Sequence, residues 1–253
     1  MKSKFKKFLY KKMFDSQNRI IFEKSKFFIS KKIRNNFRHM QYLNMGKKNK
    51  NKTFYIIQRK IGGGFFSNLL YVLNHLVICE KLNFIPVVDV ENFSSFYNEK
   101  LKINGTLNSW EYYFDQTSKY SLKEVYESRN VIITSNKTFK NYRYRAFNKY
   151  KDFNKVFKKY INIKKDILFE VKDIIKRLNI NKNNTVGLHW RGTDHKFLPN
   201  HPQPPTRKQI FEKVDKILKK KKLKKIFAIT EDPDYLNILE KKYKSKILYL
   251  NSF

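Results

Sequence analysis

The chain has 253 residues, which is enough for two small domains or one large one. Hydrophobic residues make up 41% of it and aromatic residues 16%, so a packed core can form and disorder throughout the chain is excluded. The single cysteine, Cys79, excludes an internal disulfide, and its place in an apolar helical run predicts a buried, unreactive thiol.

The formal net charge of +35 is typical of proteins that bind nucleic acid or anionic membranes. Lys, Asn, Ile, Phe and Tyr are abundant together, however, and each has a codon made only of A and T. The basic residues are also spread along the chain. We therefore attribute much of the charge to coding bias and expect no specific nucleic-acid partner, although phosphates will be attracted to such a surface.

Residues 1–52 are predicted to form a basic leader and linker. Ile29, Ile33, Phe37 and Met40 have helical spacing, and Lys47–Lys52 is predicted to be solvated. Two interpretations stay open: a stem, or a basic helix that lies on anionic lipid. No stretch has the ~20 apolar residues of a membrane span, and no apolar region follows the basic N-terminus as in a signal peptide. We expect a cytoplasmic protein, with peripheral contact at the inner face of a membrane as the second interpretation.

Residues 53–150 are predicted to form a first Rossmann-like domain. A strand at Phe54–Ile57, a glycine turn at Gly62–Gly64, a helix to about Lys81 and a strand at Phe84–Val88 make a βαβ unit, and hence a parallel sheet. Residues 91–130 are irregular and aromatic, residues 131–134 form another strand, and the basic stretch 136–160 holds the domain junction.

Residues 151–253 alternate helix and strand as in half of a doubly wound domain. Thr206 and Pro233 have the types and positions that begin helices. The predicted order is a helix at 167–178, a strand at 185–190, a proline-rich loop at 195–205, a helix after Thr206, a strand at 225–230, a helix from Pro233 to about Tyr243, and a strand at 246–250.

Two strand ends in this second domain carry polar side chains that suit a ligand. His189 and Arg191 project to the same side of one strand, and Gly192 after them allows close backbone approach. The guanidinium of Arg191 offers a planar set of donors for phosphate oxygens, although Asp194 could instead neutralise it. At the second strand end, Asp232 is expected to cap the helix that Pro233 opens, which leaves the Glu231 carboxylate available to accept two N–H groups.

The run Gly187-Leu188-His189-Trp190-Arg191-Gly192-Thr193-Asp194, followed after a proline-rich loop and a helix by a strand ending Thr230-Glu231-Asp232-Pro233, resembles the α1,6/protein-O-fucosyltransferase superfamily, which includes nodulation-type fucosyltransferases. Residues 54–89 resemble the glycine-turn opening of its N-terminal domain. The resemblance implies an α/β fold of the GT-B type, with two Rossmann-like halves, and an inverting transfer of fucose from GDP-fucose to a glycan or glycolipid acceptor, with neither a metal nor a cofactor.

Residue by residue, the resemblance implies that Arg191 contacts the β-phosphate of GDP-fucose and is the residue that assists catalysis. It also implies that His189 lies near the nucleotide and that Glu231, where the family has Asp, reads guanine. The other donor-side candidates are Gly192, Thr193, Asp232, Gly63 and Gly64. Since the family continues with further sheet and helices beyond a point equivalent to Phe253, we expect the second domain to be truncated.

The remaining candidates have weaker patterns. Asp89 at a strand end, with Trp110 and Tyr112, is a candidate for the acceptor side, although aromatic clusters in long loops are usually core. The spacing of His75, His195 and His201 does not indicate a metal site. Two other interpretations remain: a basic α/β nucleic-acid-binding protein, and an inactive protein that binds a GDP-sugar.

Overall fold

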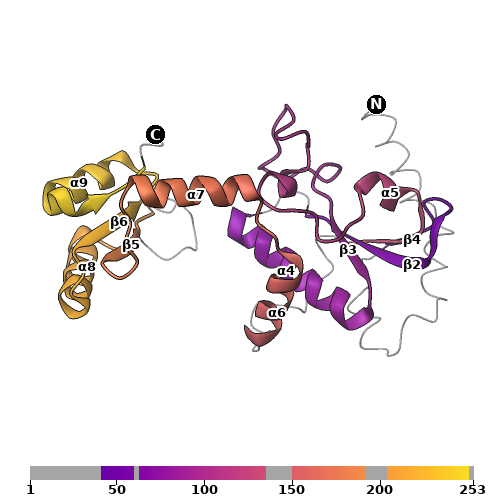
Figure 1. Cartoon of the computed structure of the whole chain (residues 1–253), viewed down its shortest axis with the longest axis horizontal. Coiled ribbons are helices and arrows are strands. Elements are labelled where there is room, and N and C mark those ends of the chain that lie inside the picture. Colours follow the sequence, from indigo (N-terminus) through magenta and orange to yellow (C-terminus); the bar gives the residue numbers. More distant parts are fainter. Residues whose placement is uncertain (1–40, 60–62, 135–149, 192–203, 251–253) are drawn as a thin grey trace. The chain divides into compact units, whose positions relative to one another are not determined.

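The computed structural model describes residues 41–59, 63–134, 150–191 and 204–250. These residues form two compact units, which meet in sequence between Lys164 and Lys165. Each unit is an α/β layer structure built on its own small sheet (Figure 1).

The first unit has a four-stranded sheet in the order β1-β4-β2-β3. The strands are β1 (Gln41–Leu43), β2 (Lys48–Ile57), β3 (Ile85–Val88) and β4 (Ser128–Ile133). β2 runs parallel to both β3 and β4, and β1 is an antiparallel edge strand against β4. The predicted βαβ unit is therefore confirmed, because helix α4 (Phe65–Leu82) connects the parallel strands β2 and β3.

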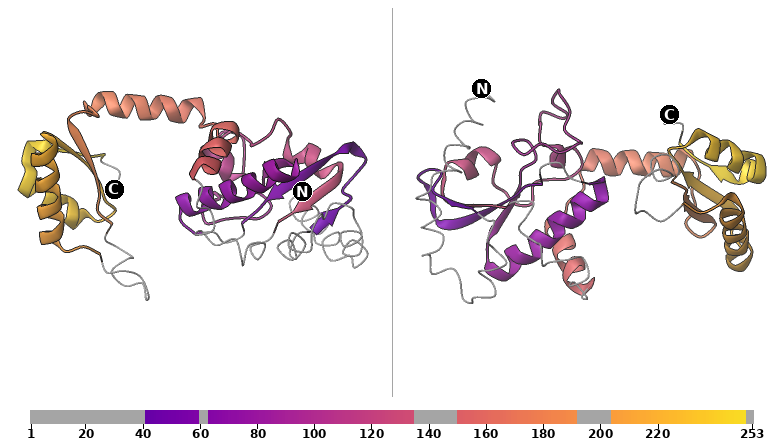
Figure 2. Two further views of the ribbon diagram at one scale, coloured as in Figure 1. Left: turned by 90° about the horizontal axis from the view of Figure 1, so that it is seen from below. Right: turned by 180° about the vertical axis from the view of Figure 1, so that it is seen from behind.

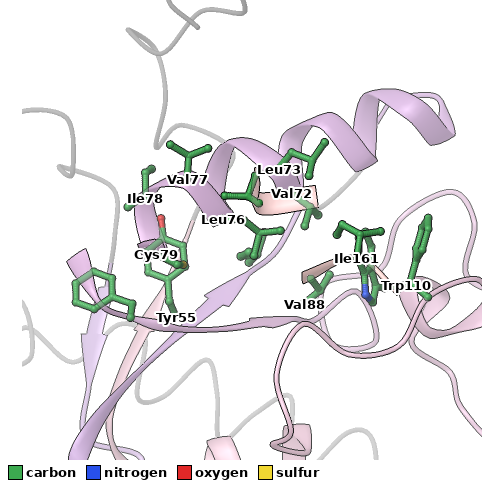
Figure 3. Close-up of a cluster of buried hydrophobic side chains, with 14 of the residues drawn as sticks. Tyr55, Val72, Leu73, Leu76, Val77, Ile78, Cys79, Val88, Trp110 and Ile161 are labelled. Carbon is green, nitrogen blue, oxygen red and sulfur yellow. The ribbon is translucent and has the colours of Figure 1, made fainter. Parts of the chain in front are cut away.

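Both faces of this sheet are covered. Tyr55 and Ile57 of β2 pack with α4 in one apolar cluster, while Phe54 and Ile56 belong to a second cluster on the opposite face. The second cluster includes α5 (Leu122–Tyr126), and the first is drawn in Figure 3. Cys79 lies in the first cluster, where burial raises the pKa of its thiol, as its predicted unreactivity requires.

Two expectations for the N-terminal region are wrong. Residues 47–52 were expected to be a solvated linker, but Lys48–Lys52 form the first half of β2, and β1 lies within the predicted leader. The lysine side chains stay exposed. Lys48 pairs with Ser128 of β4, and the register then shifts before Thr53, which pairs with Asn130. The Nζ atom of Lys48 lies 2.7 Å from the Glu127 carboxylate. The predicted helix over residues 29–40 lies outside the described residues, so its contact with a membrane stays a prediction.

The boundary between the units differs from the predicted junction at residues 150 and 151. Helix α6 (Tyr150–Tyr160) packs against α4, so it belongs to the first unit. The hydroxyl of Tyr160 donates to the carboxylate of Glu80 on α4, and Val156 and Ile161 join the apolar cluster there. The basic composition of this segment had suggested a loop, but its apolar residues have a helical partner.

The second unit has a three-stranded sheet, β5-β6-β7, in which all strands are parallel. Its elements are the helix α7 (Lys165–Arg177), the strand β5 (Thr185–His189), the helix α8 (Arg207–Lys221), the strand β6 (Lys225–Ile229), the helix α9 (Pro233–Tyr243) and the strand β7 (Ile247–Leu248). The helices α8 and α9 share one core with the sheet (Figure 2). The predicted alternation of helix and strand is confirmed for this unit.

The predicted helix starts are also confirmed. Thr206 caps α8 in a capping box with Gln209, and Asp232 caps α9 with Pro233 in its first turn. Within the described residues, no helix is both long enough and apolar enough to cross a bilayer.

Candidate functional site

The first strand end of the second unit places three consecutive side chains on alternate sides. Trp190 is 2% exposed and stacks on Tyr235 with their ring centroids 3.9 Å apart. Its backbone N–H donates to the carbonyl of Ile229 at 3.0 Å, which continues the pairing of β5 with β6. His189 and Arg191, on either side of Trp190 in sequence, are exposed. The alternation predicted from the sequence thus puts Trp190 in the core and presents its two neighbours to solvent.

The neighbouring strand end is shaped by its helix cap. A carboxylate oxygen of Asp232 accepts the backbone N–H of Asp234 at 3.0 Å, and the Thr230 hydroxyl accepts the backbone N–H of Asp232 at 3.1 Å. Asp232 is buried, whereas Glu231 is exposed. Asp232 therefore supports the turn, and Glu231 is the side chain that the turn presents at the surface.

Arg191 and Glu231 face each other across the two strand ends. The Nε atom of Arg191 lies 3.6 Å from a carboxylate oxygen of Glu231, and the two side chains are 49% and 38% exposed. This separation is an ion pair rather than a hydrogen bond. An exposed pair of this kind contributes only ~0.2–1 kcal/mol to stability. A phosphate or a guanine base could therefore compete for either partner at small cost.

Several candidates of this site lie outside the described residues. They are Gly192 and Thr193, together with Asp194, His195 and His201. Their predicted roles stay predictions. Among the residues that the structure does describe, no group of three or more His, Cys, Asp or Glu side chains has the arrangement of a metal site.

In the first unit, Gly63 and Gly64 begin α4 at the carboxyl end of β2. Gly64 is the N-cap residue with a φ of −56°, so this position does not need a positive φ. The Arg59 guanidinium closes the turn, because its Nη1 atom donates to the Ser67 carbonyl at 2.8 Å and to the Asn68 side chain at 3.1 Å. The Asn68 amide in turn donates to the Gly63 carbonyl at 3.1 Å. Arg59, just beyond the end of β2, and Gly63 are thus both tied to the first turn of α4.

Asp89, the acceptor-side candidate at the end of β3, is fully buried. One of its oxygens accepts the backbone N–H groups of Glu91 and Asn92 at 3.1 and 2.9 Å, and the other accepts the Tyr126 hydroxyl and the Asn92 amide. Burial raises the pKa of the Asp89 carboxyl, and these hydrogen bonds oppose the rise. In this structure Asp89 holds the turn after β3 and offers no surface to an acceptor.

Trp110 and Tyr112 are buried as well. The indole of Trp110 donates to the Asp115 carbonyl at 3.0 Å, and the Tyr112 hydroxyl accepts the Glu99 backbone N–H at 3.3 Å. Tyr112 therefore packs its loop. Trp110 has a second place, because it lines a cavity of about 50 Å³ in the first unit that also borders Arg59 and Asn68.

The sequence analysis did not single out Arg59, Asn68 or the aromatic Phe65 and Tyr97, which border the same cavity. A signal for Arg59 was present: it lies two residues beyond a strand end, as Arg191 does. The other three could not be found in this way, because the cavity is formed by residues far apart in the chain.

Comparison with known proteins adds a structural relationship. No family sequence model matches the chain, and no curated protein matches it by sequence. Among solved structures, it is similar to a NodZ alpha-1,6-fucosyltransferase soaked with GDP-fucose, at 11% identity over 80% of this chain and 79% of that chain, with a TM-score of 0.51.

The chain has a fucosyltransferase-like fold. Two further similar structures are a fucosyltransferase NodZ from Bradyrhizobium, at 11% identity over 80% and 79% of the two chains with a TM-score of 0.47, and POFUT1 in complex with GDP, at 14% identity over 80% and 61% with a TM-score of 0.32. At such identities the comparison establishes architecture, and the predicted α/β, GT-B-like fold class is confirmed.

Proposed function

We propose that this chain is a glycosyltransferase that transfers fucose from GDP-fucose to a hydroxyl of a glycan or glycolipid. The observation that carries the proposal is the pairing of Arg191 with Glu231 at the carboxyl ends of two adjacent parallel strands, in a fucosyltransferase-like fold. In open parallel sheets, ligands bind beyond these ends.

The two partners suit opposite ends of a guanosine diphosphate. The guanidinium of Arg191 is a fork of donors for β-phosphate oxygens, and the carboxylate of Glu231 can accept two N–H groups of guanine. His189 is exposed on the same side of the strand and lies beside the nucleotide in this proposal. In this proposal the donor replaces the 3.6 Å ion pair between the two side chains with contacts to the ligand.

The proposed reaction inverts the anomeric carbon of fucose. An oxygen–carbon bond forms from the acceptor hydroxyl, the bond from that carbon to the β-phosphate oxygen breaks, and the proton of the hydroxyl passes to solvent. Negative charge then accumulates on the departing GDP. Arg191 would stabilise this charge, which is the role of a positioned cationic donor in such a transition state, and the proposal includes neither a metal nor a cofactor.

Calorimetry with GDP, GDP-fucose, GDP-mannose and UDP tests the donor half. We expect GDP and GDP-fucose to bind and UDP to bind much more weakly, with fucosyl transfer to a glycan in a parallel assay. Binding without transfer would instead support the inactive GDP-sugar-binding protein. Steeply salt-dependent binding to DNA or RNA that survives Arg191→Ala, without GDP binding, would support the basic nucleic-acid-binding protein.

A further inference from the structure

A cavity of about 50 Å³ lies at the carboxyl edge of the first sheet, where β2 and β3 end beside the first turns of α4. All of its lining residues belong to the first unit. Its walls are mainly apolar and include Phe65, Leu69, Val72, Val88, Trp110 and Phe114. Three of these, Val72, Val88 and Trp110, are labelled in Figure 3.

The walls are held by contacts with one another. The ring of Phe114 stacks on Phe65 with centroids 5.9 Å apart and lies 4.5 Å from the ring of Trp110. The only polar atom of the Trp110 side chain, its indole nitrogen, donates to the Asp115 carbonyl and thus has its partner in the protein. The cavity is therefore a preformed apolar space, and a ligand would not have to order its walls.

Two hydroxyls at the cavity bond to the protein. The hydroxyls of Ser95 and Ser109 lie 3.2 Å apart, and each donates to the side-chain oxygen of Asn98. A sugar ring placed inside would lose hydrogen bonds to water and find few replacements, which is costly. An apolar group would lose none and would displace poorly bonded water, since 50 Å³ exceeds the ~10–15 Å³ that one water molecule needs.

Arg59 supplies the charged group at this cavity. Its Nη1 atom is fixed by the Ser67 and Asn68 bonds, and its guanidinium lies over the Tyr71 ring at 5.1 Å. A guanidinium fixed in this way beside an apolar cavity suits a ligand with a polar part next to an apolar part.

We propose that this cavity binds an apolar alkyl or aryl group attached to the acceptor sugar, with the sugar itself outside the cavity near Arg59. The inference rests on the proposed function, because it assigns the cavity to the acceptor. It narrows the acceptor from any glycan to a glycoside that carries an apolar aglycone.

The test uses the two tryptophans of the chain. In a Trp190→Phe background of the full chain, Trp110 becomes the only tryptophan, and its emission reports on the cavity. Methyl, butyl and hexyl β-D-glucopyranosides serve as probes with one sugar and a growing apolar group. Each buried methylene tightens binding by about fourfold, so we expect the butyl glycoside to bind at least tenfold more tightly than the methyl glycoside. Equal dissociation constants for the three would overturn the proposal.

Two variants test whether the tighter binding of the butyl glycoside arises in the cavity. Leu69→Phe would fill the cavity. Leu70→Phe is its matched control, because Leu70 is half-buried like Leu69 but does not line the cavity. We expect Leu69→Phe to remove the preference for butyl over methyl and Leu70→Phe to keep it, with folding checked by circular dichroism. Val90→Phe, in the loop after β3, also lies at the cavity and replaces Leu69→Phe if that variant does not fold. An unchanged butyl preference in the filled cavity would overturn the proposal.

The binding of GDP and GDP-fucose is measured separately by calorimetry, so the outcomes distinguish failure of this inference from failure of the proposed function. Chain-length-dependent binding without GDP binding would show that the cavity binds an apolar group, but it would reject the fucosyltransferase and, with it, the assignment of the ligand as an acceptor. GDP binding without chain-length dependence would reject the cavity assignment only.

Discussion

Arg59 lies two residues beyond the end of β2, and Arg191 lies two residues beyond the end of β5. The Nη1 atom of Arg59 donates to both the carbonyl and the hydroxyl of Ser67, at 2.8 and 3.0 Å, and the guanidinium lies over Tyr71. Arg191 is 49% exposed and is 3.6 Å from Glu231. One arginine is built into the junction between a strand and a helix, and the other is presented at the edge of its sheet.

The acidic residues of the two units differ in the same way. Asp89 follows β3, the parallel neighbour of β2, and Glu231 lies two residues beyond β6, the parallel neighbour of β5. Asp89 is fully buried and accepts bonds from two backbone N–H groups, whereas Glu231 is 38% exposed. Position at a strand end therefore does not make a residue functional. The exposure of its two charged side chains distinguishes the proposed donor site from the turn that the buried Asp89 holds.

Replacing Arg191 tests this distinction most strongly. We expect Arg191→Ala to lower the rate of fucosyl transfer by ~10²–10³, because charge on the leaving GDP loses its cationic donor. The melting temperature should change little, since an exposed ion pair contributes at most ~1 kcal/mol. Initial rates with GDP-fucose and a thermal melt check both parts. Arg191→Lys should be similarly inactive, and near-normal turnover in that variant would exclude two-pronged phosphate recognition.

Arg59→Ala should have the opposite effects: it should lower stability and leave the affinity for GDP unchanged. The loss of its bonds to Ser67 and Asn68 is expected to lower the free energy of unfolding of the first unit by about 1–2 kcal/mol. The affinity for GDP should stay the same, because these contacts lie wholly within the first unit. Urea unfolding and GDP calorimetry measure the two quantities. A loss of GDP affinity without a loss of stability would make the two arginines equivalent and would remove the distinction.

Glu231→Gln tests whether the exposed acidic residue, in contrast to the buried Asp89, binds a ligand. The amide of Gln replaces one of the two acceptor oxygens with a donor NH2 and so cannot accept the two guanine N–H groups side by side. We therefore expect the affinity for GDP to fall about tenfold, while UDP is unaffected. Inorganic pyrophosphate should bind as well as before or better, because Arg191 loses its counter-charge. Calorimetry with the three ligands is the measurement. Unchanged GDP affinity would mean that Glu231 serves only to neutralise Arg191.

The smallest effect is expected for Asp89→Asn and depends on pH. Burial raises the pKa of Asp89 in the folded protein above the ~3.9 of an unfolded chain, so the folded state binds more protons between these two values. The contribution of Asp89 to stability is therefore fully present below the unfolded pKa and declines as pH rises through the folded pKa. The free energies of unfolding of the wild type and of Asp89→Asn can be measured with urea at pH 7, 5 and 4. We expect the wild type to become more stable relative to the variant as pH falls. If the difference in free energy of unfolding between the wild type and Asp89→Asn became smaller as pH falls, this prediction would be contradicted.

Local patterns in the sequence determined much of the second unit. Thr206 and Pro233 marked the starts of α8 and α9. Strand alternation predicted that His189 and Arg191 share one side of their strand, and both are exposed. These features depend on residues within one turn or one strand of each other, where side-chain type and spacing are sufficient.

Only the tertiary structure decided the rest. Lys48–Lys52 belong to a strand because Lys48 and, after a register shift, Thr53 pair with β4, about eighty residues further along the chain. The Asn130 side chain of β4 also donates to the Lys50 carbonyl, and lysine-rich composition carries no sign of these contacts. The 3.6 Å contact of Arg191 with Glu231 and the burial of Asp89 under Tyr126 likewise join separate strands and helices. The sequence by itself determined which strand ends carry charge. The packing of distant segments decided which of those charges are buried and hydrogen-bonded within the protein and which are exposed. Burial and hydrogen-bond partners come from residues that are remote in sequence, so local patterns could not predict them.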